Sequence, residues 1–135
     1  MSMSYQRADE TLEDALTNGT PHIWLHTGDP GENGTANVAQ VNTANIDRKA
    51  VTSGVPENHS TNDERICLNT NEIEWTGEEI DDSQEITHFS VWSADTAGQL
   101  EFLETIAESK VTGSDGVTIQ IGDLEIAIGV YVKPA

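Results

Sequence analysis

The chain has 135 residues, which suits a single domain with one modest core. Its six basic residues stand against 24 acidic ones, so the formal net charge is −18 and the isoelectric point lies near 4.1. Because this charge repels phosphates and anionic headgroups, it excludes a nucleic-acid binder and a polybasic membrane anchor.

The acidic residues are spread along the whole chain, while apolar segments recur up to its last residues. This pattern predicts a folded core under a solvated acidic surface rather than a disordered chain. We expect it of a protein that folds in very high salt, where charge repulsion is screened within a few ångström; a mesophilic acidic domain is the alternative. Apolar runs are too short to span a bilayer, and the N-terminal residues lack the apolar region of a secretory signal, so we expect neither membrane insertion nor secretion by that route.

The first predicted element is a short helix in ADETLEDALTNGTP, where Leu12 and Leu16 recur at helical spacing. Gly19 ends this helix and Pro21 prevents its resumption. A helix this short is not stable alone, so it has to dock on the rest of the protein. Residues 1–20 are therefore predicted to form an N-terminal arm and helix.

Short segments with strand periodicity follow, bounded by turn signals: 22–27, 46–52, 65–70, 72–75, 86–93, 99–106, 117–121 and 124–132. The segment 86–93 is apolar on both faces, which predicts a central strand. The segments 54–64 and 77–85 are interpreted as a polar loop and an acidic connection. Several short strands with turns between them predict an all-β fold for residues 21–135, an antiparallel β-sandwich or barrel of jelly-roll-like type.

Two acidic segments are candidates for cation binding. The loop GDPGENG (28–34) has the glycines of a phosphate loop but neither its lysine nor a following helix. It offers carboxylate oxygens to calcium, yet its spacing matches no EF-hand, so tight turns are the preferred interpretation. The acidic run in 78–85 is similarly interpreted as a solvated connection. The candidate ligands are Asp29, Glu32, Asp81 and Asp82.

The histidines and the cysteine predict no chemistry. Four histidines suggest zinc: His22, His26, His59 and His88. On a strand, however, His22 and His26 stand about 13 Å apart, so we expect hydrogen-bonded sheet residues. The single Cys67 excludes an internal disulfide, and beside Ile66 and Leu68 it is predicted to be a buried apolar residue. Without a hydrolase motif, we predict no catalytic residue, no cofactor and no enzyme.

Two further sets of residues are candidate sites. Sequons in predicted turns or loops give three possible glycosylation sites: Asn18, Asn33 and Asn58. The tryptophans lie on predicted strands, where they are either core residues or anchors of an interface. Together with the apolar face of the helix, the possible interface residues are Leu12, Leu16, Trp24, Trp75 and Trp92.

Three segments carry a resemblance: WLHTGDPGENGTAN, ITHFSVWSADTAGQLEF and SKVTGSDGVTIQIGDLEIAI. In this order they resemble a family of small virion proteins of tailed viruses, from about residue 20 to the end. The matching positions are 25–30, 48–52, 86–92, 98–102 and 122–124. The chain departs from the family pattern at Ser93, where aspartate is usual, and in 57–70, where small residues are usual.

The resemblance implies a virion structural protein without catalytic residues. We expect a capsid-surface turret or decoration protein; a tail, baseplate or fibre protein is the alternative, and a carbohydrate-binding adsorption module is an alternative of another class. The acidic composition favours a haloarchaeal tailed virus as the source. The expected partners are further copies in a trimer to hexamer, the major capsid protein or neighbouring virion proteins, and host surface glycans. The expected location is the virion, on the capsid surface or tail, with assembly in the host cytoplasm.

Overall fold

The computed structural model describes residues 4–41 and 48–130. Helix α1 (Tyr5–Leu12) continues into one π-helical segment, η1 (Glu13–Thr17). The strands of the described residues are β1 (His22–His26), β2 (Arg48–Ala50), β3 (Glu57–Asn58), β4 (Glu64–Leu68), β5 (Ile73–Thr76), β6 (Glu85–Trp92), β7 (Leu100–Val111), β8 (Gly116–Ile119) and β9 (Glu125–Gly129). No helix in these residues is long and apolar enough to cross a membrane.

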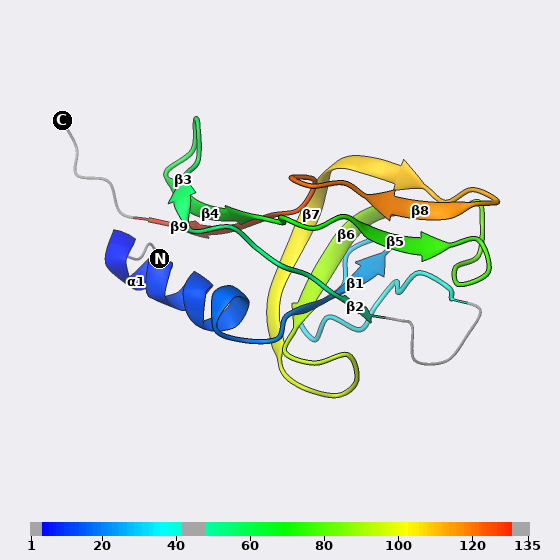
Figure 1. The fold of residues 1–135 in the computed structure, drawn as a ribbon, viewed down its shortest axis with the longest axis horizontal. Helices are drawn as coiled ribbons and strands as arrows, with labels where there is room; N and C mark the ends of the chain where they lie inside the picture. Colours follow the sequence, from blue (N-terminus) through cyan, green and yellow to red (C-terminus); the bar gives the residue numbers. More distant parts are fainter. Residues whose placement is uncertain (1–3, 42–47, 131–135) are drawn as a thin grey trace.

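The predicted N-terminal helix is confirmed, and it begins earlier than its apolar pattern does. Ser4 is the N-cap, because its hydroxyl accepts a hydrogen bond from the amide of Arg7 at 3.2 Å. One face of the helix is buried through Ala8 and Leu12, and Leu16 continues this face into η1. The helix lies at one end of the molecule against β4 and β9 (Figure 1).

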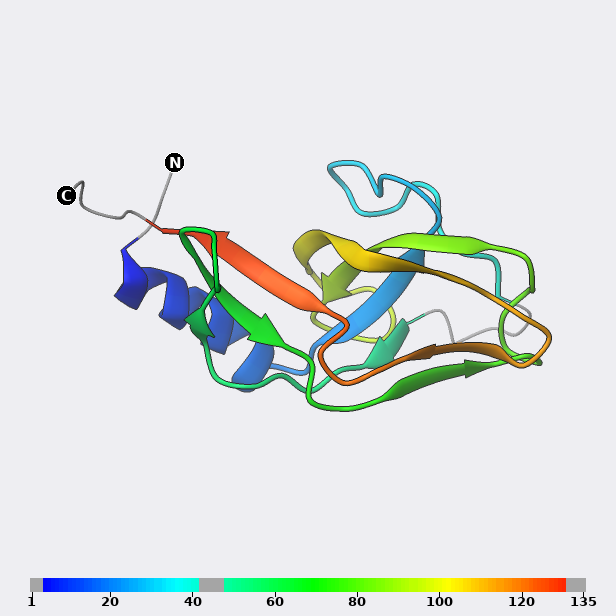
Figure 2. The same ribbon diagram turned by 90° about the horizontal axis from the view of Figure 1, so that it is seen from above.

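The strands form open antiparallel sheets. One sheet has the order β2-β1-β6-β7, so β6 lies between two strands, as predicted for segment 86–93. The others are β3-β4-β9 and the two-stranded β5-β8, and Figure 2 shows β5 and β8 running along one side of the four-stranded sheet. The predicted all-β sandwich is confirmed, and since the sheets are not closed on themselves, it is not a barrel.

Most of the second layer is one bent ribbon, because β4 leads into β5 and β8 leads into β9. Asn69 lies at the bend and is 2% exposed. Its side-chain amide donates to the carbonyl oxygens of Asn71 and Gln120, both at 2.9 Å. Its side-chain oxygen accepts from the amides of Gly122 at 3.0 Å and Leu124 at 2.9 Å. One side chain therefore joins both strands of the ribbon where the ladder is interrupted.

Alternating side chains fill the core as the period-two segments predict. On β5, Ile73 and Trp75 are buried while the residues between and after them are exposed. The alternation in segment 117–121 stops early, since Ile121 is 66% exposed. Beyond β8 the chain turns at Gly122, which has φ +86°, and the carboxylate of Asp123 accepts the amide of Gln120 at 2.7 Å.

Strand β7 is longer than the predicted segment 99–106 and contains a large bulge. Ile86 of β6 is paired with Lys110 of β7, and two residues later His88 is paired with Thr105. Four residues of β7 therefore lie opposite a single residue of β6. A bulge bends a strand and breaks its period, so the sequence pattern fades where the strand continues.

Two segments predicted to be loops contain residues with β-pairing. The predicted polar loop 54–64 includes the short strand β3, which is paired with β4. The predicted acidic connection 77–85 contains Ile80, which is 1% exposed and forms an isolated β-bridge with Val41. Residues 46 and 47 of one predicted strand and residues 131 and 132 of another lie outside the described residues.

Candidate functional site

The strand register gathers aromatic and polar side chains on one face of the four-stranded sheet. Trp24 of β1 is paired with Arg48 of β2 on one side and with Ser90 of β6 on the other. His26 and Trp92 each lie two residues further along β1 or β6 on the same face. The matching segments of the resemblance, which are distant in sequence, thus meet at one place.

The core of this place is the Trp–Arg cluster, formed by Trp24, Arg48 and Trp92. The guanidinium carbon of Arg48 lies 3.9 Å from the ring centroid of Trp92 and 4.8 Å from that of Trp24. The two indoles are themselves edge-to-face, with centroids 5.8 Å apart. Trp24 is held by these ring contacts, since its buried indole nitrogen has no hydrogen-bond partner among the described residues. The cation therefore stacks on both rings.

Arg48 also closes the loop between β6 and β7. Its Nη1 donates to the carbonyl oxygens of Ala94 at 3.2 Å and Ala97 at 2.6 Å. At the loop's ends, the hydroxyl of Ser93 accepts the amide of Gln99 at 2.7 Å. The hydroxyl of Ser93 thus joins the two ends of this loop.

A chain of hydrogen bonds runs next to the cluster and defines the His26 relay: Trp92, Ser90, His26 and Ala36. The indole Nε1 of Trp92 donates to Ser90 Oγ at 2.8 Å, and that hydroxyl lies 2.7 Å from Nε2 of His26. Nδ1 of His26 lies 2.8 Å from the carbonyl oxygen of Ala36, which can only accept. Nδ1 therefore carries the proton and Nε2 accepts from Ser90. Burial lowers the pKa of His26, which keeps the imidazole neutral.

The His26 relay holds the loop 28–37 through the carbonyl oxygen of Ala36. This loop forms tight turns, as predicted. The carboxylate of Asp29 accepts the amide of Gly31 at 2.9 Å, and Asn37 Nδ2 donates to the Asp29 carbonyl oxygen at 2.9 Å. Gly34 has φ +68°, and a Cβ there would meet Leu100 at 2.9 Å. Glycine is favoured at this left-handed, close-packed position, because a side chain would strain the backbone and displace Leu100.

We expect Arg48→Lys to lower the free energy of unfolding by about 1–2 kcal/mol, because an ammonium cannot stack on both indoles and bond two carbonyl oxygens at once. Amide exchange in the loop 93–99 should become faster. Denaturant unfolding and hydrogen exchange measure both effects. Arg7→Lys is the control, since exposed Arg7 forms an ion pair only with Glu10 of its own helix among the described residues. Equal effects of the two substitutions would contradict this role of Arg48.

The predicted cation ligands are not brought together. Among the residues that the structure describes, the only close group of three ligating side chains is His59, Glu64 and Glu125. Nδ1 of His59 accepts the backbone amides of Thr61 at 3.1 Å and Asn62 at 2.9 Å. A neutral imidazole then carries its proton on Nε2, which faces Glu125 at 3.4 Å. Neither nitrogen has a lone pair left for a metal, so the group does not fit one.

In the acidic connection 77–85, the side chain of Glu79 makes contacts that stabilise the fold. The side chains of the predicted cation ligands of this segment, Asp81 and Asp82, make no such contact among the described residues. Hydrogen bonding from the amide of Thr76 lowers the pKa of Glu79, and Lys49, 2.9 Å away, lowers it further. Asp81 and Asp82 are exposed and have no such partner among the described side chains, and Glu32 is exposed in its loop. His26 and His88 lie opposite each other, but both nitrogens of His26 are bonded within the relay.

The remaining candidates occupy different environments. Asn18 and Asn33 are exposed in turns, whereas exposed Asn58 lies in β3 and its side chain accepts from Arg65 at 2.9 Å. Leu12, Leu16 and Trp75 are buried in the protein's own core, Trp92 is 8% exposed and Trp24 is half-buried. Cys67 is fully buried and free, as predicted, and burial raises the pKa of its thiol to about 11.

Glu104 has a perturbed pKa that the sequence pattern does not predict. It extends from β7 and accepts the amide of Ala127 in β9 at 3.5 Å. Burial raises its pKa from 4.5 to about 7. The hydrogen bond from Ala127 opposes this shift, and the carboxylates of Glu64 and Glu125 add to it.

The raised pKa predicts a stability that depends on pH. Since the folded state disfavours ionised Glu104, its contribution is full below pH 4.5 and is lost as the pH rises to about 7. The shift corresponds to at most about 3 kcal/mol, and partial exposure reduces it to about 1–2 kcal/mol. Glu104→Gln should therefore be more stable than the parent at pH 8 and equal to it at pH 4.5. Exposed Glu108→Gln is the control in denaturant titrations at both pH values, and an equal gain there would contradict the assignment.

Comparison with known proteins places the sequence of this chain in a family. Residues 8–127 match the family described as "Podophage GP4 fiber I protein gp80", and this range is 120 of the 135 residues. None of the curated proteins matches the sequence significantly. The family description agrees with the resemblance to structural proteins of tailed viruses, and it favours the fibre alternative over the predicted head decoration. The chain belongs to the podophage GP4 fiber I protein family.

Proposed function

We propose that this protein is a structural subunit of a viral tail fibre that works through lasting contacts and not through chemistry. The family match over residues 8–127 carries this proposal. The structure supports it, because the polar residues that a reaction would use are occupied elsewhere. Arg48 holds a loop, both nitrogens of His26 are bonded, and Glu79 is engaged by a lysine and an amide.

The proposal includes assembly in several copies, a trimer to hexamer, on the virion, with neighbouring virion proteins as partners. Closed symmetric assemblies are the usual form of repeated identical chains. Assembly would take place in the host cytoplasm, and exposed loops of the fibre would be positioned to contact host surface glycans. Glycosylation at exposed Asn18 or Asn33 is compatible with such a location.

Disruption of the gene in the virus tests the fibre role. We expect particles with intact, DNA-filled heads that lack a fibre and adsorb poorly to host cells. Complementation with the parental gene should restore both the fibre and adsorption. Particles with complete fibres but unstable or undecorated heads would contradict the proposal and return the protein to the head.

We further propose that the protein folds best in concentrated salt, as its charge of −18 suggests. Raising KCl from 0.1 M to 2 M shortens the screening length from about 10 Å to a few ångström. A gain of about 2 kcal/mol would raise the unfolding temperature by roughly 10 °C. Calorimetry at the two salt concentrations measures this, with equal osmolality of sucrose as a non-ionic control. An unfolding temperature independent of KCl would contradict salt adaptation.

A further inference from the structure

The N-terminal helix is attached to the body mainly by its docking surface. Helix α1 packs on β4 and β9 at one end of the molecule (Figures 1 and 2). Ala8 and Leu12 have no exposed surface and Leu16 is 3% exposed. The covalent connection to β1 is only residues 18–21. The contact is therefore a compact apolar interface within one chain.

A matched charge pair gives this interface its specificity. Arg65 of β4 donates to both carboxylate oxygens of Asp9 in α1, from Nε at 2.7 Å and from Nη2 at 3.0 Å. Its guanidinium carbon lies 5.3 Å from the ring centroid of Tyr5. The pair joins elements 56 residues apart and is half-buried. A bidentate pair of this kind recognises one partner geometry.

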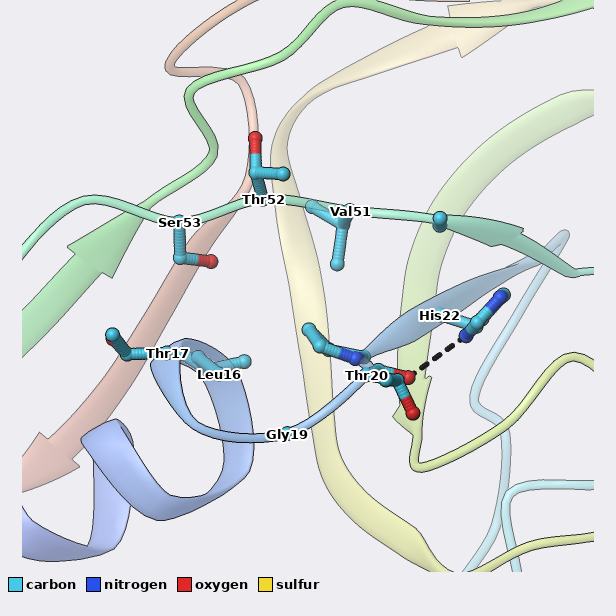
Figure 3. Close-up of a pocket in the computed structure, with 10 residues that line it drawn as sticks. Leu16, Thr17, Gly19, Thr20, His22, Val51, Thr52 and Ser53 are labelled. Atoms are coloured by element: carbon cyan, nitrogen blue, oxygen red, sulfur yellow. Dashed lines mark hydrogen bonds between the residues drawn. The ribbon is translucent and has the colours of Figure 1, made fainter.

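The connection between helix and body lines a groove of about 410 Å³ (Figure 3). Leu16 and Gly19 line it on the helix side and Val51 and Ser53 on the other. The hydroxyl of Ser53 is buried and has no hydrogen-bond partner among the described residues.

Gly19 is the pivot of this connection. The residue before it, Asn18, is bonded to the helix through Glu13, and the residue after it, Thr20, donates its hydroxyl to Ser93 in the body at 2.8 Å. A Cβ on Gly19 would lie 2.8 Å from the carbonyl oxygen of Ala15. The closed turn thus depends on the absence of a side chain at one residue.

Exchange of the helix needs no new contact surface between two copies. The surface that α1 covers on β4 and β9 already complements a helix of this sequence. Exchange keeps each of these contacts and changes only the pivot, which is a low-energy route to an oligomer.

We propose that two copies of this protein exchange their N-terminal helices, so that residues 5–17 of each copy dock on β4 and β9 of the other. The inference rests on assembly in several copies, with the exchanged pair as the repeating unit of a tetramer or hexamer, and not on the location of those copies. Leu12 and Leu16, which the sequence suggests as interface residues, are then core residues and interface residues at the same time.

Charge-reversed variants test the exchange. Asp9→Arg places two guanidinium groups at the contact of one chain, and Arg65→Asp places two carboxylates at the contact of another. Neither variant can pair within its own chain. When the two are refolded together in 2 M KCl, exchange brings the two substituted side chains together at one contact and the parental Asp9 and Arg65 together at the other. Both contacts then become attractive.

We expect the mixture to form a heterodimer by native mass spectrometry and to unfold at least about 5 °C above either variant alone. The double variant Asp9→Arg/Arg65→Asp should fold on its own, and its identical copies should exchange helices without the addition of a second variant. Gly19→Ala should increase the dimer fraction of the otherwise parental chain several-fold, because it disfavours the closed turn.

A mixture that remains monomeric and keeps the unfolding temperatures of its separate components would overturn the exchange. The same charge changes at exposed positions, Arg7→Asp mixed with Glu108→Arg, form the control pair. Heterodimers of that pair would show association by charge alone and would equally overturn the proposal. Either failure leaves the fibre assignment untouched, since the gene disruption tests it separately.

Discussion

Asn69→Ala is expected to lower the free energy of unfolding by about 4 kcal/mol, the largest effect of a single polar substitution in this protein. The substitution removes the side-chain partner of the buried Leu124 amide, of two carbonyl oxygens, and of the Gly122 amide, which keeps a bond to the Asn69 carbonyl oxygen. Each unsatisfied buried group costs about 1–3 kcal/mol, and relaxation of the bend recovers part of that. Denaturant unfolding at fixed salt measures the loss.

Two companion substitutions separate the bend from general effects. Asn69→Asp keeps the acceptor oxygen for Gly122 and Leu124 but removes both donors, so it should also lose several kcal/mol. Asn62→Ala removes an exposed amide bonded to Glu64 and should change stability by less than about 0.5 kcal/mol. A loss below about 1 kcal/mol for Asn69→Ala would show that the ribbon keeps its bend without this residue.

His26→Leu should lower the free energy of unfolding by about 2–4 kcal/mol. The apolar side chain is of similar volume, but it leaves the hydroxyl of Ser90 without its acceptor and the carbonyl oxygen of Ala36 without its donor. Because Ala36 belongs to the loop 28–37, amide exchange in this loop should become faster than in the sheets. Hydrogen exchange with mass spectrometry resolves the two regions.

The same variant should alter the pH dependence of stability in one direction. Burial lowers the pKa of folded His26 below 6.5, so the unfolded chain takes up the proton first. The stability that neutral His26 contributes is complete above pH 6.5 and is lost as the pH falls below it. His26→Leu lacks this loss. His22→Leu is the matched control on the same strand, since His22 is only half-buried and its Nδ1 contacts the nearby carbonyl oxygen of Thr20.

The strand segments were predictable from the sequence because burial on one face repeats every second residue. Ile73 and Trp75 follow this rule, and the doubly apolar segment 86–93 forms β6, which has a neighbouring strand on each side. The helix was predictable from its spacing and its Gly19 ending. These features depend on residues close in sequence, where local rules apply.

The sequence pattern does not contain the contacts that depend on register. Trp24, Arg48 and Trp92 form a cluster only because β1 pairs with both β2 and β6 in one alignment. Asn69 resembles any loop asparagine until residues 120–124 are placed beside it. The raised pKa of Glu104 likewise arises from β4 and β9, far along the chain. Such contacts can be identified only after the strand pairing is known.

We propose that this protein is a building block of a fibre, with its polar cluster used for stability. Cryo-electron microscopy of intact virions, with the unaltered protein bound by a labelled antibody fragment raised against it, tests this proposal most directly. We predict label in symmetric copies along or at the base of tail fibres, with heads unlabelled. Label distributed over the capsid lattice, or virions without label, would contradict it.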